Sequence, residues 1–200
     1  PPARGMYDPA NEHDACGVGF IADIKGRKSH SIVSRGVDIL ENLTHRGAVG
    51  ADPLDGDGAG ILIQTPDAFC RAVAPTELPA HGEYATGLVF LPTDPAARAA
   101  CEQALDGALQ RTGLQPLGWR DVPTDSSRIG RDARATEPCV RQIFVARGAV
   151  DPERFRFMLY IARKRAERQV HDERLAPSAY FYVNSLNPDT VLYKGMLLSD

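Results

Sequence analysis

The sequence has few cysteines, no long hydrophobic run and no excess of charge of one sign. Its 200 residues include four cysteines, and the net charge is −3 with acidic and basic residues well mixed. The longest apolar runs, such as residues 88–91, are far shorter than the roughly 18 residues of a membrane span. A basic footprint for nucleic acid is also absent. We therefore expect neither a membrane nor a nucleic acid as partner.

The cysteines Cys16, Cys70, Cys101 and Cys139 lie far apart, with no C-x-x-C pair and no close histidine partner. A structural zinc site needs ligands at short spacing, so we expect no metal site. Nothing in the sequence supports disulfides, and the N-terminus lacks the apolar core of a signal peptide. These features indicate a cytoplasmic protein.

Hydrophobic residues make up 43% of the chain, enough to bury a core, and the pattern mixes strands with helices. Because the apolar runs are short, they predict strands rather than buried helices. We expect a mixed α/β arrangement of two or more layers, whose strand directions stay open. The predicted strands are residues 17–24, 61–64, 86–91, 143–146, 180–186 and 190–194.

Three segments have helical periodicity. Residues 31–46 carry apolar side chains at i, i+4, i+7 and i+10, with Ser29 or Ser31 as the cap and Gly47 as the stop. Two further helices open on the pairs 94–95 and 151–152, both Asp-Pro, which suit the N-cap and first helical positions. Residues 122–138 are polar and predict a long loop with one short turn. The basic run at residues 163–168 is interpreted as the solvated face of the third helix.

The segment ADPLDGDGAG at residues 51–60 has two further interpretations that fail on spacing. Asp52, Asp55 and Asp57 suggest a calcium loop, but a glutamate is missing at the twelfth position. The glycines also miss the G-x-G-x-x-G pattern, since the third comes one residue early and a strand follows. We therefore interpret the segment as a turn that leads into a strand.

Residues 14–20, taken with residues 43–47, carry the clearest sign of chemistry. Cys16 stands at the mouth of a predicted strand and is followed by Gly17 and Gly19, which leave room for a substrate to approach. From the residues alone, two other interpretations stay open. Cys16 is either a buried structural cysteine or one half of a pair with His13.

These two segments resemble the start of a class II glutamine amidotransferase domain. Within that family the chain is similar to the amino-terminal end of glutamate synthase large subunits, and the similarity extends over nearly all 200 residues. The stretches that carry it are residues 7–9, 12–20, 42–48, 55–61, 141–145 and 193–197.

The resemblance implies an α+β fold, the αββα sandwich of the N-terminal-nucleophile hydrolases, incomplete at its C-terminus. It also implies two parts of the chain. Residues 1–15 would be a propeptide, and residues 16–200 would be the front part of the type-2 glutamine amidotransferase domain.

The same resemblance implies roles for two residues. Cys16 would be the catalytic nucleophile, exposed when the propeptide ending at Ala15 is removed, because only then is its nitrogen a free amine that can act as base. Arg46 would be the substrate-binding residue that orders the nucleophile and the glutamine pocket. From the residues alone, Arg46 is equally well explained as a helix-end charge.

The implied reaction is hydrolysis of glutamine through a cysteine thioester to glutamate and ammonia. Ammonia would pass to 2-oxoglutarate for reductive amination in glutamate biosynthesis. FMN and an iron–sulfur cluster are expected in the full-length protein and no cofactor in this segment, with a small subunit or ferredoxin as electron donor. Because the family's Asn-Gly oxyanion donors do not occur before Asp200, we expect this chain to be inactive alone.

Two other functions remain open at this point. One is another class II amidotransferase that supplies ammonia to a sugar or nucleotide precursor. The other is a non-catalytic module of the same fold.

Overall fold

The computed structural model describes residues 17–43, 54, 56, 58–176 and 180–196. The chain divides into two units. The first unit comprises Pro1–Ile61, Ser126–Ala135 and Lys194–Asp200, and the second comprises Leu62–Asp125 and Thr136–Tyr193. Each unit is described by itself below.

The two Asp-Pro pairs begin helices, as predicted. In α3 (Pro95–Arg111) the Asp94 carboxylate accepts a hydrogen bond from the Ala97 amide at 2.8 Å. In α5 (Pro152–Asp172) the Asp151 carboxylate accepts from the amides of Glu153 and Arg154. Each aspartate satisfies amides that have no partner within the helix, which is why these two starts are encoded locally.

The helix α1 (His30–Asn42), in the first unit, confirms Ser29 as the cap, because the Ser29 hydroxyl accepts from the Ser31 amide. The helix ends at Asn42, and residues 44–46 of the predicted span lie outside the described residues. Of the predicted apolar stripe, Val33, Leu40 and Leu43 are half-buried, and one member, Val37, is not. Val37 is 42% exposed, whereas a Cβ on Gly36 would lie 2.9 Å from Ile61. Because the contact needs close approach, the glycine takes the position expected for the valine.

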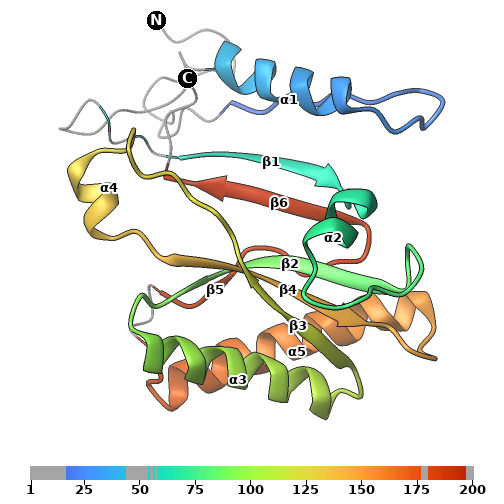
Figure 1. Cartoon of the computed structure of the whole chain (residues 1–200), viewed down its shortest axis with the longest axis vertical. Helices are drawn as coiled ribbons and strands as arrows, with labels where there is room; N and C mark the ends of the chain where they lie inside the picture. The colour runs from blue at the N-terminus through green and yellow to red at the C-terminus, as the bar shows by residue number, and fades with distance from the viewer. Residues whose placement is uncertain (1–16, 44–53, 55, 57, 177–179, 197–200) are drawn as a thin grey trace, which may run out of the picture. The chain divides into compact units, whose positions relative to one another are not determined.

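The second unit contains a four-stranded sheet in the order β3-β4-β2-β5. Its strands are β2 (Tyr84–Leu91), β3 (Gln115–Asp121), β4 (Cys139–Ala146) and β5 (Tyr182–Val183), and every neighbouring pair is antiparallel. Helices α3 and α5 lie side by side across one face of this sheet (Figure 1). The core between them is apolar and includes Val89, Leu105, Ile143, Phe155 and Leu159.

Two elements of the second unit were missed. Strand β3 contains Pro116 and Gly118, which are poor strand formers, and its register with β4 shifts between them. Because β3 is an edge strand, a residue without an amide hydrogen is tolerated there. Helix α2 (Asp67–Val73) is too short to give a periodic signal. The short turn expected within residues 122–138 is confirmed as α4 (Arg131–Ala135) in the first unit.

Two predicted strands need correction. Residues 17–24 form no strand, and Val18 is 92% exposed, because no other described segment pairs with them. The strand predicted at 180–186 is only Tyr182–Val183. The amides of Asn184 and Ser185 both donate to the Leu88 carbonyl, so the ladder is interrupted after β5. It resumes as a single bridge between Thr86 and Asn187.

The last two strands, β1 (Ala59–Gln64) and β6 (Thr190–Gly195), pair in a two-stranded sheet. They confirm the strands predicted at 61–64 and 190–194, and each has residues in both units. The structure thus confirms a mixed α/β fold with antiparallel pairing in the four-stranded sheet. None of the helices in the described ranges combines the length and apolar character that crossing a membrane requires.

Gly87 generates a first prediction. A Cβ at this position would lie 1.7 Å from the Ser185 carbonyl oxygen, which is a backbone atom that cannot turn aside. We expect Gly87→Ala to lower the free energy of unfolding by about 3 kcal/mol or more, measured by denaturant titration. Gly107→Ala in α3 is the control. There the added methyl would meet only the flexible Arg111 side chain, so we expect no loss and a gain of up to about 1 kcal/mol.

Asp106 generates a second prediction. Burial raises the pKa of this carboxyl, although Trp119 Nε1 donates to it at 3.1 Å. Its ionised form therefore opposes folding at neutral pH, and stability increases as pH falls through the raised pKa. We expect Asp106→Asn, which keeps an acceptor for Trp119, to raise Tm at pH 7. The gain should vanish below the ordinary pKa of 3.8. A constant gain across this range would contradict the assignment.

Candidate active site

The two residues predicted to carry the chemistry, Cys16 and Arg46, lie outside the described residues. The same holds for His13 and for the three aspartates of the rejected calcium loop, Asp52, Asp55 and Asp57. What the structure describes is the chain on either side of these residues.

The segment directly after Cys16 is open on one side and tightly packed on the other. Val18 and Phe20 are almost fully exposed. A Cβ on Gly19, however, would lie 2.5 Å from Cγ2 of Ile39 in α1. Only glycine allows this approach, so Gly19 holds the segment against the helix that leads into residues 43–47.

A second close approach in the first unit joins two motif stretches. Gly58 has φ +112°, a conformation that other residues rarely adopt. A Cβ there would lie 3.0 Å from the carbonyl oxygen of Gly195. Gly58 belongs to the DGDGAG stretch (residues 55–60), and Gly195 belongs to the YKGML stretch (residues 193–197), about 135 residues further along the sequence. The two stretches are therefore in contact through these glycines.

In the first unit, glycines thus allow close approaches between segments that are distant in the sequence. Gly19 packs against α1, and Gly58 packs against Gly195. These two contacts account for glycine at positions 19 and 58, since neither leaves space for a side chain. Sequence reasoning identified the motifs but could not predict which of them touch.

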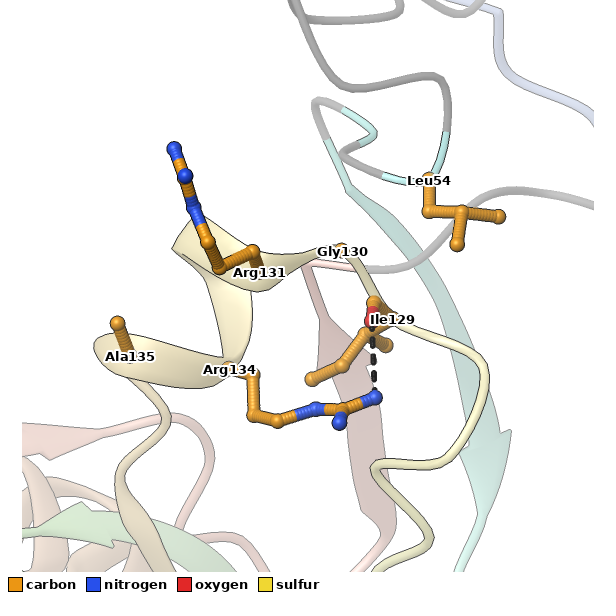
Figure 2. A pocket seen from close by; sticks show the side chains of 6 residues that line it. All are labelled: Leu54, Ile129, Gly130, Arg131, Arg134 and Ala135. Atoms are coloured by element: carbon orange, nitrogen blue, oxygen red, sulfur yellow. Dashed lines mark hydrogen bonds between the residues drawn. The ribbon is translucent and has the colours of Figure 1, made fainter.

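A cavity of about 450 Å³ lies between Leu54 and α4 (Figure 2). The arginines beside it are already engaged. Arg134 Nη2 donates to the carbonyls of Ser126, Ser127 and Ile129, and Arg131 pairs with Asp132. In Figure 2 the Arg134 side chain turns toward Ile129, and Arg131 extends away from it. With an apolar lining and no uncommitted charge, this cavity offers no catalytic group.

Sequence reasoning missed a buried polar chain in the second unit. Gln142, fully buried in β4, donates through Nε2 to the Thr86 hydroxyl at 2.8 Å, and that hydroxyl donates to the Ile143 carbonyl. Arg120 Nε donates to Gln142 Oε1 at 2.7 Å, and its guanidinium lies over the Phe69 ring. The only signal is a glutamine within an apolar strand. The chain contains no acid–base pair, so its role is to satisfy buried polar groups.

The buried thiols are poor nucleophiles. Burial raises the pKa of Cys101 to about 11 and also raises that of Cys70. Because the thiolate is the reactive species, neither has a useful reactive fraction at neutral pH. Cys139 is partly buried. No group of three His, Cys, Asp or Glu side chains within the described ranges is arranged to hold a metal ion.

Comparison with known proteins gives one family and a consistent set of relatives. The family of class-II glutamine amidotransferases matches residues 16–200. The Glutamate synthase [NADPH] large chain of Bacillus subtilis is 40% identical over 200 residues, which is 98% of this chain and 13% of that protein.

Two further relatives give similar matches. The Glutamate synthase [NADH] of Schizosaccharomyces pombe is 39% identical over 98% of the chain and 10% of its own length. The Ferredoxin-dependent glutamate synthase 2, chloroplastic, of Arabidopsis thaliana is 36% identical over the whole chain and 12% of its own length. The chain therefore spans only about an eighth of the length of these relatives.

The contact between Gly58 and Gly195 generates a prediction with a matched control. Gly82 also has a positive φ, but a Cβ there would meet nothing within 4 Å. Gly82→Ala therefore measures the backbone strain alone, about 1 kcal/mol. We expect Gly58→Ala to cost at least about 1 kcal/mol more, because the methyl also meets a carbonyl oxygen. Denaturant titration of both variants gives the difference, and equal losses would contradict the contact.

Proposed function

The chain belongs to the class II glutamine amidotransferases, and on that premise we propose that it is the front part of the glutaminase domain of a glutamate synthase large subunit. In this proposal residues 1–15 are a propeptide and residues 16–200 belong to the domain. The observation that carries the proposal is the extent of the family match, which begins at Cys16. A domain whose first residue is its nucleophile would begin at that position.

Cys16 is the proposed nucleophile. Once the peptide bond to Ala15 is cleaved, Cys16 has a free α-amine with an ordinary pKa near 8, so a useful fraction is unprotonated at neutral pH. That amine takes the thiol proton, directly or through one water, and the thiolate attacks the side-chain carbonyl carbon of glutamine. With the bond intact, the nitrogen is an amide and cannot act as base.

The remaining steps need no reactant other than water. The carbon–nitrogen bond breaks as the α-ammonium returns its proton to the leaving ammonia, which leaves a γ-glutamyl thioester on Cys16. Water, deprotonated by the same amine, hydrolyses the thioester to glutamate and regenerates the thiol. We assign Arg46 to ordering the nucleophile and the glutamine pocket through its fixed positive charge.

The described residues support this assignment in two ways. Cys70 and Cys101 are buried and have raised pKa values, so neither competes with Cys16 as a nucleophile at neutral pH. In addition, Gly19 holds the segment after Cys16 against α1 while Val18 stays exposed. The chain beside the proposed nucleophile is therefore both fixed and open to solvent.

We further propose that residues 16–200 contribute to the αββα sandwich of N-terminal-nucleophile hydrolases. The four-stranded sheet with α3 and α5 across one face supports one strand layer and one helix layer of that architecture.

In the whole protein, ammonia would be added to 2-oxoglutarate and the product reduced to glutamate in the cytoplasm. A small subunit or ferredoxin would donate the reducing electrons, which FMN and an iron–sulfur cluster would carry. The described residues do not fit a cluster, which needs about four cysteine ligands, because Cys70 and Cys101 are buried on separate helices. We therefore place both groups in other parts of the polypeptide.

The proposal predicts the N-terminus of the mature protein. In the full-length protein we expect the first residue to be Cys16, because only then is its amine a base. Intact-mass measurement with N-terminal sequencing tests this. A fully active enzyme that still carries residues 1–15 would rule out the mechanism.

Cys16→Ala should lower glutamine-dependent glutamate synthesis by the full-length protein by at least about 10³-fold, because no thioester can form. Synthesis from added ammonia bypasses this step and should remain. Cys139→Ala is the control, since it removes another thiol that is not fully buried and should leave both activities in place. Equal loss of both activities in Cys16→Ala would indicate a structural role for Cys16.

A further inference from the structure

Helix α5 exposes two large aromatic side chains on the side away from its core contacts. Phe155 and Leu159 are buried against the sheet, whereas Phe157 is 63% and Tyr160 is 55% exposed. Phe157 and Tyr160 are three residues apart, so they lie one above the other on the helix surface. Large exposed aromatics grouped on one surface mark contact sites more often than single exposed residues do.

Other exposed aromatics of the second unit are covered by a cation. The guanidinium of Arg120 lies 5.5 Å from the centre of the Phe69 ring, and that of Arg163 lies 5.9 Å from the Tyr182 ring. Within the described ranges, no guanidinium lies over Phe157 in this way. Among the described residues, Phe157 and Tyr160 therefore lack the arginine contact that covers similar rings elsewhere in the second unit.

Helix α5 also carries cations without anionic partners among the described residues. The helix has six Lys or Arg residues and three Asp or Glu residues. Arg156 pairs with Asp189, and Arg163 and Lys164 both pair with Glu167. Arg154, Arg165 and Arg168, by contrast, pair with no carboxylate in the part of the chain that the structure describes.

Helical periodicity places these groups on one surface. Phe157, Lys164 and Arg168 recur at i, i+7 and i+11 and form the outermost row, with further aromatic, aliphatic and basic residues beside it. We call this surface the α5 outer face. Its members are Glu153, Arg154, Phe157, Tyr160, Ile161, Lys164 and Arg168, three cations and one anion.

We propose that the α5 outer face docks onto a protein surface that presents carboxylates around an apolar patch, located in another part of the same, longer polypeptide. Burial of Phe157 and Tyr160 would supply apolar contact, and the carboxylates would pair with the arginines. Aromatic residues and arginine are enriched at such interfaces. This step rests on the proposed membership in a longer large subunit, in whose relatives the matched part is only 10–13% of the length.

Charge argues against other occupants. A symmetric contact between two copies would set the cations of the α5 outer face against themselves, because the same patch serves both partners. A nucleic acid or an anionic membrane would attract the helix, but the chain as a whole carries a net charge of −3. A carboxylate-bearing surface of limited extent fits the local excess of positive charge without that conflict.

Hydroxyl-radical footprinting of the full-length protein tests the proposal. Phe157 and Tyr160 should be oxidised at least about 10-fold more slowly than Phe69, which is less exposed in this chain at 46%. In the double variant Arg154→Glu/Arg168→Glu the oxidation of Phe157 should rise at least about 5-fold. Arg98→Glu on α3 is the control and should change nothing. Oxidation of Phe157 as fast as that of Phe69 in the unaltered protein would overturn the proposal.

Carbodiimide cross-linking of Arg168→Lys identifies the partner, because it joins an amine only to a carboxylate in contact. We expect a link from position 168 to an Asp or Glu outside residues 1–200 of the same polypeptide. Mixing ¹⁵N-labelled with unlabelled protein separates links within one chain from links between copies. Three outcomes would each overturn the proposal. They are links only between copies, no link at all, and binding to phosphatidylserine vesicles or duplex DNA that the double variant abolishes. Cys16→Ala should leave the oxidation of Phe157 and Tyr160 unchanged. A failure of the glutaminase proposal is therefore distinguishable from a failure of the docking proposal.

Discussion

Burial of both faces of the central strands β2 and β4 is the constraint on which the second unit depends. On one face Val89 and Ile143 meet the apolar side of α3 and α5. On the other face Thr86 and Gln142 are equally buried but polar, so each must find a partner inside the protein. The hydrogen bond between them, with Arg120 as the next member, meets that need and ties three strands together.

Glycines decide where the chain approaches itself closely in both units. In the second unit, the backbone at Ser185 passes over Gly87, which is possible only because no side chain stands there. In the first unit, Gly19 and Gly58 serve the same purpose, at Ile39 and at Gly195. At one of these contacts two family motifs meet, since Gly58 and Gly195 belong to the stretches 55–61 and 193–197.

The chemistry of the cysteines follows from their surroundings. Cys70 and Cys101 lie within apolar helix contacts, where the charged thiolate is disfavoured and the pKa rises. A catalytic thiol needs the opposite conditions, solvent access and a base nearby. Cys70 and Cys101 thus differ from Cys16, the residue at which the family match begins. This difference is consistent with one nucleophile in the domain.

The sequence by itself determined the features that depend on neighbours along the chain. Asp94 and Asp151 cap their helices by reaching amides two or three residues away, and the motif around Cys16 points to its family without reference to the fold. Only the tertiary structure decided strand pairing. Residues 17–24 have a strand pattern but pair with no described segment, whereas β3 contains a proline and pairs because β4 offers an edge. The reason is physical: a cap is satisfied locally, but a strand is stable only when a distant segment supplies its hydrogen bonds.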